Sequence, residues 1–182
     1  MQITFLTNNR NGKRELVQID DARITYKNFM GVGDKFNREG DRNFALIIPN
    51  EEIADELAND KNEFGAGWNV KVKPPREEGD DPFITLKVKV KFNNRGPNVY
   101  LRSGKNKVRL TEETIGCLDD MYIDHVNLDI RPYDDEINGR PFRTAYLQSM
   151  EDFQRIDRFA AKYGDGHRFG RDDENEEETL PF

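Results

Sequence analysis

The sequence predicts a mainly β domain, folded as a compact antiparallel barrel or sandwich with one or two short helices. Three observations lead to this fold class. Many short segments are rich in β-branched and aromatic residues, helical periodicity is confined to short stretches, and strands do not alternate with helices. The fourteen glycines and eight prolines supply the turns that such a domain needs.

Most of the predicted elements are strands. They are expected at residues 2–7, 22–29, 44–48, 68–73, 83–92, 98–103, 122–133 and 144–150, and a turn at Ser103-Gly104 leads into residues 107–110. Residues 30–43 predict a long polar loop with one aromatic residue, Phe36. Asn50 can N-cap a short helix over residues 51–59. Residues 111–120 predict one or two helical turns, and residues 152–163 predict a short helix.

Charge is segregated along the chain. The net charge is −7, but residues 172–182 hold six acids and no base, so residues 1–171 carry 29 acids against 28 bases. Within this nearly neutral body, residues 81–110 hold eight bases and one acid, a local charge of +7. Such segregation is typical of interaction surfaces.

Several classes of protein are excluded by what the sequence lacks. Cys117 is the single cysteine, so neither a disulfide framework nor a cysteine-based zinc site is expected. No run of about 18 apolar residues and no signal-peptide pattern is present, which fits a cytoplasmic protein. His125 and His167 are the two histidines, no phosphate-binding glycine motif occurs, and the carboxylates of residues 119–136 are typical of a solvated surface. We therefore expect a protein that is not an enzyme and uses no cofactor or metal.

Side-chain alternation is clearest at residues 83–92, where aliphatic residues point one way and lysines point the other. Residues 98–103 also alternate, and pairing of the two segments as a hairpin would bring Tyr100 and Arg102 onto the lysine face. Basic side chains attract phosphates, and an exposed aromatic ring stacks on any base for about 1–3 kcal/mol. This combination predicts binding of single-stranded nucleic acid without sequence preference.

The candidate contact residues come from these strands, their expected neighbours and the long loop. They are Lys87, Lys89, Lys91, Arg95, Tyr100, Arg102, Lys105, Lys107, Lys71, Lys73, Lys27, Phe29, Lys35, Phe36, Arg131 and Tyr133. An alternative stays open for the lysines, because lysine opposite aliphatic residues is also typical of a solvated strand protected from aggregation. Phe36 is either a loop anchor or a residue that stacks on bases. Trp68 alternates in step with Val70 and Val72, which are expected to face inward, and it is therefore assigned to the core.

The chain ends in the acidic segment DDENEEETLPF. Its six acids cannot bury a core, so no fixed structure is expected from about Gly164 onward. Leu180, Pro181 and Phe182 suit a ligand, because Phe182 can fill an apolar pocket while its terminal carboxylate pairs with a base. Pro181 stiffens the peptide and lowers the entropic cost of ordering it.

This segment resembles the C-terminal tip of bacterial single-stranded DNA-binding proteins, an acidic run that ends in a hydrophobic residue, Pro and Phe. The body is similar to phage proteins of this class that contain a single OB fold, although the long linker of the bacterial members is missing. The resemblance implies an OB-fold-like antiparallel barrel over residues 1–163 and a disordered linker and acidic tail over residues 164–182. It also implies that Leu180, Pro181 and Phe182 dock onto replication, recombination or repair proteins. A phage origin would place the protein in the bacterial host cytoplasm.

Three functions remain open. The first is a sequence-nonspecific single-stranded DNA-binding protein, and the second is an RNA-binding or annealing protein that uses the same face. The third is a phage protein-interaction module that does not bind nucleic acid. Either cooperative binding or a homodimer would help a single OB unit to bind tightly. The acidic tail is tethered to a body with a +7 segment, so it is expected to compete with DNA for that segment.

Overall fold

Nine β-strands dominate the part of the chain that the structure, a computed structural model, describes, namely residues 1–156 and residue 159. The strands are β1 (Gln2–Thr7), β2 (Arg14–Asn28), β3 (Arg42–Ile48), β4 (Val70–Lys73), β5 (Phe83–Val90), β6 (Asn98–Ser103), β7 (Asn106–Leu110), β8 (Ile123–Ile137) and β9 (Arg140–Gln154). The α-helix α1 (Glu51–Asn59) and the 3-10 helix η1 (Ile115–Asp120) complete this part. The predicted mainly β fold with one or two short helices is confirmed.

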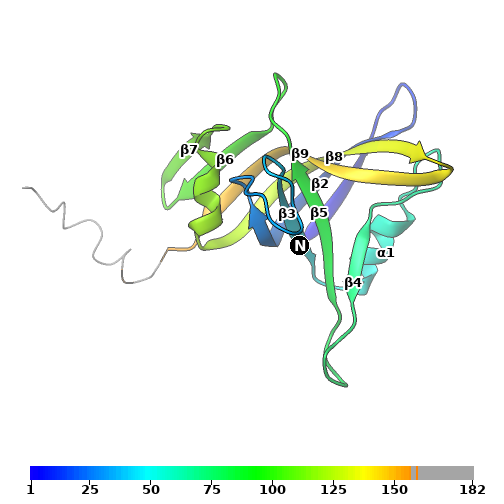
Figure 1. The fold of residues 1–182 in the computed structure, drawn as a ribbon, viewed down its shortest axis with the longest axis horizontal. Helices are drawn as coiled ribbons and strands as arrows, with labels where there is room; N and C mark the ends of the chain where they lie inside the picture. Colours follow the sequence, from blue (N-terminus) through cyan, green and yellow to red (C-terminus); the bar gives the residue numbers. More distant parts are fainter. Residues whose placement is uncertain (157–158, 160–182) are drawn as a thin grey trace, which may run out of the picture.

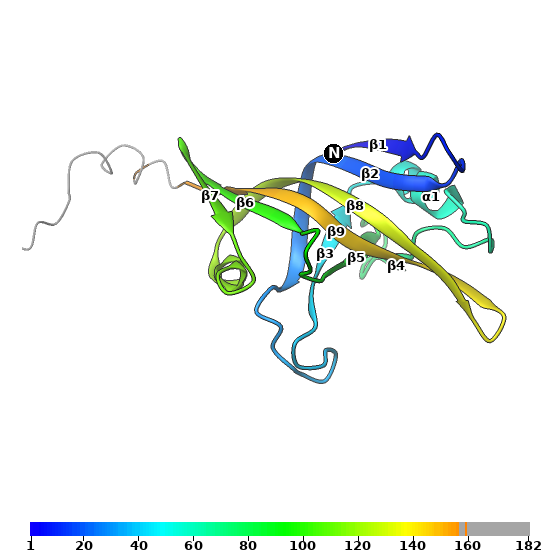
Figure 2. The same ribbon diagram turned by 90° about the horizontal axis from the view of Figure 1, so that it is seen from above.

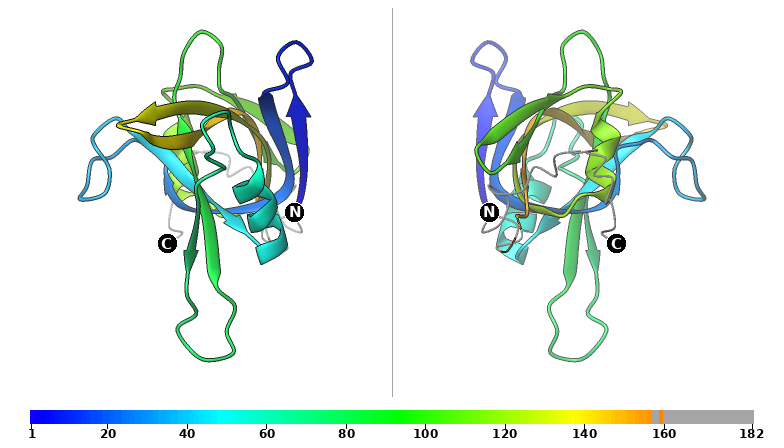
Figure 3. Two further views of the ribbon diagram at one scale, coloured as in Figure 1. Left: turned by 90° about the vertical axis from the view of Figure 1, so that its right-hand side faces the viewer. Right: turned by 90° about the vertical axis from the view of Figure 1, so that its left-hand side faces the viewer.

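Five of the strands close into a barrel. Antiparallel pairs join β5 to β3, β3 to β2, β2 to β8 and β8 to β9, and a short parallel pairing of β9 with β5 closes the ring. Figure 3 shows this ring end-on, with α1 near one end and η1 near the other. A five-stranded, mostly antiparallel barrel resembles the OB fold, so the predicted architecture is confirmed.

Strand β2 bends strongly as it passes around the barrel. Its register shifts between Ile19 and Ala22 against β8, and between Thr25 and Asn28 against β3. Tyr26 has a φ of 48°, a backbone conformation that is costly for an aromatic residue and is found at bulges. These irregularities let one long strand pair with β1, β8 and β3. The sequence predicted only the second half of this strand.

The core fills the barrel, and the two helices contribute to it. Along β5, every second residue is buried, as the alternation predicted. Trp68 is 2 % exposed, which confirms its assignment to the core. Helix α1 begins where predicted, because the Asn50 side chain accepts a hydrogen bond from the Ile53 backbone N–H at 2.9 Å. No helix of the described part is long and apolar enough to cross a membrane.

A buried polar network holds one end of the barrel. The side chain of Arg143 on β9 is 2 % exposed and donates to both carboxylate oxygens of Asp134, at 2.7 and 3.0 Å. It also donates to the Asp60 carbonyl and carboxylate at 2.6 and 3.1 Å, and Asp60 accepts further bonds from Arg14 and Trp68. Partial burial opposes ionisation of Asp60 and Asp134, but these hydrogen bonds and positive charges outweigh it, and both pKa values are lowered.

Asp152 on β9 is a buried acid of a different kind. Its side chain is fully buried, and neither carboxylate oxygen has a hydrogen-bond partner among the described residues. Burial raises the pKa of Asp152 to about 8, although the positive charge of Lys27 opposes the shift. Asp152 is therefore largely protonated in the folded protein at neutral pH.

Replacing Asp152 with Asn is expected to change how stability depends on pH. An Asp in the unfolded chain titrates near pH ~3.9, so the folded state holds an extra proton above that pH. Wild-type stability should therefore fall as the pH rises from about 4 to about 8. The variant cannot ionise at this position, and it should be more stable than wild type by at least ~1 kcal/mol near pH 8. Urea unfolding at several pH values measures this, and parallel curves for the two proteins would contradict it.

Two predicted features are wrong. Strands β5 and β6 do not form a hairpin, because each pairs in parallel with a different part of β9. Figure 1 shows β6 and β7 on one side of the barrel, set apart from the β4–β5 hairpin. The predicted helix over residues 152–163 is wrong at its beginning, since β9 continues to Gln154. The rest of that prediction falls mostly on residues 157–158 and 160–163, which lie outside the described residues, as does the tail over residues 164–182.

Candidate nucleic-acid interface

The lysine face predicted on β5 is present on the outer surface of the barrel. Lys87, Lys89 and Lys91 are exposed, while the aliphatic residues between them are buried. On the adjacent strand β3, Ala45 lies opposite Lys87, and Asn43 lies opposite Lys89. Because these side chains are short and buried, they protrude less than the lysines, and a hollow forms along β5.

A groove follows this face and consists of three hollows that share residues. The first, about 620 Å³, is lined by β2, β3, β4, β5 and the β2–β3 loop (residues 29–41). The second, about 400 Å³, is lined by that loop, β3, β5 and Tyr146 of β9. The third, about 260 Å³, lies at the end of β5 beside Arg95 and Arg131. Phe36 and Lys87 line the first two hollows, and Lys91 lines the second and third. Figure 2 shows the β2–β3 loop standing out from the barrel.

The β2–β3 loop is held in one shape by its own hydrogen bonds. The Asn28 side-chain amide donates to the carbonyls of Val32 and Asp41, and its oxygen accepts from the Val32 N–H. The two arms of the loop approach closely at Gly31, whose φ is 75°, and the Gly40 N–H donates to the Gly31 carbonyl at 2.8 Å. A Cβ at Gly31 would lie 3.2 Å from the Gly40 backbone, so glycine is required there.

Phe36 is presented at the far side of this loop. The Asp34 carboxylate accepts from the backbone N–H groups of Phe36 and Asn37, both at 2.7 Å, and these bonds lower the pKa of Asp34. The Phe36 ring is 78 % exposed, and the Lys35 ammonium lies 4.9 Å from its centroid. A loop anchor would be buried, so the exposed position favours the alternative in which Phe36 stacks on bases.

Tyr26 is a groove residue that the sequence analysis missed. Its ring is 60 % exposed, with the Lys73 ammonium 5.3 Å from the ring centroid and 3.2 Å from the hydroxyl. Simple alternation along residues 22–29 groups Arg23 with Lys27 and Phe29 and leaves Tyr26 on the opposite face. The bulge between Thr25 and Asn28 reverses this order. A positive φ at a strand residue cannot be read from alternation.

The same bulge makes one predicted contact residue, Phe29, wrong and changes the surroundings of a second, Lys27. Phe29 is fully buried and stacks on Phe44, with ring centroids 5.3 Å apart. Lys27 lines the first hollow, but its ammonium donates to the carbonyls of Leu118 and Met121 at 2.7 and 2.6 Å, so it also holds η1 in place. Lys71 and Lys73 on β4 line the groove as expected.

The other wall of the groove is formed by β8 and β9. Tyr146 lies opposite Lys89 in the parallel pairing that closes the barrel. The Arg131 guanidinium lies 5.1 Å from the Tyr146 ring centroid, and the half-exposed Tyr133 meets Tyr146 edge-on at 6.3 Å. The prediction placed Arg131 and Tyr133 together, which is correct, but it did not include Tyr146. Its contact with β5 depends on barrel closure, which a local pattern does not reveal.

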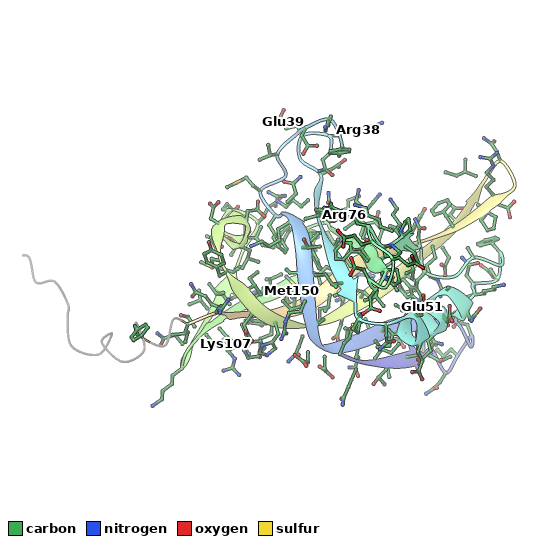
Figure 4. All side chains as sticks on the ribbon, turned by 90° about the horizontal axis from the view of Figure 1, so that it is seen from below. Arg38, Glu39, Glu51, Arg76, Lys107 and Met150 are labelled. Atoms are coloured by element: carbon green, nitrogen blue, oxygen red, sulfur yellow. The ribbon has the colours of Figure 1, made fainter. Side chains whose placement is uncertain are left out.

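Besides the buried Phe29, six of the predicted contact residues do not line the three hollows. Lys35 and Tyr133 lie next to lining residues, at Phe36 and Tyr146, and the other four lie on another surface. Tyr100, Arg102, Lys105 and Lys107 are on β6, β7 and the turn between them, and none of them lines the three hollows. Figure 4 shows Lys107 and the groove residue Arg38 pointing to opposite sides of the molecule. The +7 segment is therefore divided between two surfaces.

The metal-ligating residue types of the described part of the chain do not gather into one site. No group of three or more His, Cys, Asp or Glu side chains among them could hold a metal ion. The His125 ring stacks on Phe153 at 4.2 Å, and its Nδ1 lies 2.7 Å from an Asp124 carboxylate oxygen, both on the outer surface. The predicted docking residues Leu180, Pro181 and Phe182 lie outside the described residues.

Solved structures of one phage protein share this fold. The single-stranded DNA-binding protein from bacteriophage Enc34 has a TM-score of 0.50 at 15 % identity, covering 86 % of this chain and 92 % of that chain. Its C-terminal truncation has a TM-score of 0.50 at 16 % identity, covering 86 % and 97 %. Its complex with ssDNA has a TM-score of 0.47 at 17 % identity, covering 79 % and 88 %. No curated protein sequence matches the chain significantly.

The model of one protein family matches almost the whole chain. The match covers residues 7–178, and the family is described as "Putative phage ssDNA-binding domain". It includes every strand of the barrel, the β2–β3 loop and both walls of the groove. The predicted resemblance to phage single-stranded DNA-binding proteins is thereby confirmed, and this chain belongs to the phage ssDNA-binding domain family.

Proposed function

We propose that this protein binds single-stranded DNA along the groove beside β5, without sequence preference. The observation that carries the proposal is the continuity of the groove, in which lysines accompany exposed aromatic rings from β4 to the end of β5. Lysine and arginine neutralise phosphates and release counterions, and the rings offer flat surfaces to unpaired bases. A duplex hides its base faces, so the rings favour single strands.

The polar groups in the floor of the groove support binding without sequence preference. The Asn28 amide is engaged by Val32 and Asp41. The Asn43 amide donates to Asn37 and to the Asp41 carbonyl. Amide groups held in this way do not read base edges, which are recognised by hydrogen bonds. The interactions that remain available to DNA are those of charged side chains with phosphates and of aromatic rings with base faces, and neither distinguishes one base from another.

A fluorescence titration of the full-length protein tests the class of ligand. Oligo-dT, oligo-rU and duplex DNA should be compared at several salt concentrations. Tight binding of oligo-dT that weakens steeply with salt is the expected result. Preference for oligo-rU would favour the RNA-binding alternative. Failure to bind any of the three would favour the third alternative, a phage protein-interaction module that does not bind nucleic acid.

Replacing Phe36 with Ala is expected to weaken binding of oligo-dT by about 1–3 kcal/mol, the usual contribution of one base stacked on a ring. Stability should change little, because the ring is mostly exposed. The same titration measures the affinity, and urea unfolding measures the stability. Phe64→Ala is the matched control, since Phe64 is an exposed aromatic residue that does not line the three hollows. Wild-type affinity in the Phe36 variant would refute its stacking role.

We propose further that the C-terminal residues Leu180, Pro181 and Phe182 recruit replication, recombination or repair proteins in the host cytoplasm. The support is the sequence itself, an acidic run followed by the apolar residues Leu180, Pro181 and Phe182. Pull-down of purified phage and host replication proteins by full-length protein, compared with a form lacking Phe182, tests this. Equal capture by both forms would contradict the proposal.

Deletion of residues 172–182 is expected to tighten binding of single-stranded DNA, most visibly at low salt. The deletion removes six acids that are tethered to a nearly neutral body with one +7 segment and that compete with DNA phosphates for this segment. Titration of the full-length and truncated proteins with oligo-dT checks the effect, which should shrink as salt screens the charges. Unchanged or weaker binding by the truncated protein would show that the tail does not compete.

A further inference from the structure

Within the described residues, eight aromatic rings have a cation at close range, and five of them lie in the groove or on the strands that continue from it. Three belong to the groove, where Lys73, Lys35 and Arg131 lie 5.3, 4.9 and 5.1 Å from the ring centroids of Tyr26, Phe36 and Tyr146. The other two lie beyond it, where Lys107 and Arg102 lie 4.5 and 5.8 Å from the ring centroids of Tyr100 and Phe153. We name the second surface, formed by Tyr100, Arg102, Lys105, Lys107 and Phe153, the β6–β7 face.

The groove and the β6–β7 face are joined by strand β9. Tyr146 of β9 lies opposite Lys89 of β5, and further along β9, Glu151 and Phe153 lie opposite Tyr100 and Arg102 of β6. Between these two pairings lies the third hollow, lined by Arg95 and Gln148. The outer side of β9 therefore leads from the groove, past Arg95, to the β6–β7 face.

From this arrangement we propose that a strand of single-stranded DNA leaving the groove at Arg95 continues onto the β6–β7 face. There, Tyr100 and Phe153 stack on bases, while Arg102, Lys105 and Lys107 hold phosphates. A ring with a cation beside it fits one nucleotide, because the base needs a flat surface and the phosphate needs a positive charge. The inference rests on the proposed function of the groove and extends it to a second site on the same molecule.

The charge of the β6–β7 face suits an anionic strand. Arg102, Lys105, Lys107 and Arg109 lie near two acids. Glu151 lies 3.3 Å from both Arg102 and Lys107, and Asp124 lines a hollow beside Arg102 and Phe153. Partial burial opposes ionisation of Glu151, but these two bases outweigh it and its pKa is lowered. The two acids leave an excess of two bases among these residues, and Glu151 holds Arg102 and Lys107 beside the rings.

Protection of an edge strand does not explain this face fully. Strand β7 is at the end of the sheet, and lysine there would discourage edge pairing with other chains. Protection of an edge strand needs only the lysine and arginine side chains and does not need an aromatic ring beside each of them. The His125 ring stacks on Phe153 at 4.2 Å and 9° between planes and covers one face of it, so a base would stack on the remaining face. Rings kept partly exposed and paired with cations are what a base-stacking surface requires.

A comparison of oligonucleotide lengths tests the proposal with the full-length protein. An oligo-dT of about 6 nucleotides should fill the groove alone, and one of about 20 should cover both surfaces, since OB folds bind roughly 4–16 nucleotides. The double variant Tyr100→Leu/Phe153→Leu keeps apolar contacts but removes both rings. It should bind the long oligonucleotide about 10-fold more weakly than wild type and the short one equally well. Phe64→Leu is the control, and circular dichroism verifies the fold.

Each outcome decides a different claim. Wild-type affinity of the double variant for the long oligonucleotide would overturn the extension while leaving the groove intact. Equal weakening for both lengths would also overturn it, because the rings would then act through the barrel and not as a second site. Wild-type protein that binds neither oligonucleotide would refute the proposed function of the groove, and the extension with it.

Discussion

Reversing the charge of Lys87, Lys89 and Lys91 to Glu is expected to weaken binding of oligo-dT by about 100-fold or more at low salt. Each lysine is exposed on the groove side of the barrel, and each loses a favourable phosphate contact and gains a repulsive one. In single strands each neutralised phosphate contributes about 0.7 to the slope of log affinity against log salt. The salt dependence of the variant should therefore be shallower as well.

The matched control is the triple variant Arg10→Glu/Lys61→Glu/Arg140→Glu. It changes the net charge by the same amount at exposed positions that do not line the groove. Titration with oligo-dT at several salt concentrations should show a much smaller loss for the control. Equal losses for the two triple variants would mean that net charge, and not the groove, determines binding.

Replacing Arg143 with Met is expected to destabilise the fold by about 3–5 kcal/mol, the usual result of removing one partner from a buried ion pair. The variant leaves Asp134 and Asp60 partly buried without the guanidinium that faces both of them. It also removes a cation 5.1 Å from the ring centroid of Trp68. Urea unfolding measures the loss.

The pH dependence of this loss provides a second check. In wild type, the pKa values of Asp60 and Asp134 are lowered, so their contribution to stability is present above pH ~4 and is lost as the pH falls through the folded-state values. The difference between wild type and Arg143→Met should therefore shrink in acid. Arg140→Met, at an exposed position of the same strand, is the control and should be nearly neutral. A constant difference at every pH would contradict the ionic role of Arg143.

Local alternation predicted the outer surface wherever the strands are regular. Along β5, the period of two holds for eight residues, so the lysine face was found correctly. In β2, a bulge at Tyr26 reverses the inward–outward alternation of the side chains. The prediction therefore placed Phe29, which is buried, on the surface and missed Tyr26, which is exposed. Phe36 was identified correctly because it lies in a polar loop, where its exposure does not depend on the alternation of a strand.

Long-range pairing could not be predicted from the sequence. Strand β6 follows β5 closely, and a hairpin was the simplest expectation, but both strands pair with β9 in parallel. Parallel pairs join segments that are distant in sequence, and no local signal specifies the partner. For this reason Tyr146 was missed, and Tyr100 and Arg102 were placed on the groove, whereas they lie beyond it along β9.

Photo-cross-linking followed by mass spectrometry tests the central claim most directly. The full-length protein should be irradiated with an oligo-dT in which thymines are replaced by 5-iodouracil, a base analogue that couples to aromatic side chains stacked on it. The groove predicts cross-links at Tyr26, Phe36 and Tyr146. Efficient cross-linking elsewhere, for example at the exposed Tyr122, with none at these three residues would show that single-stranded DNA does not lie in the groove.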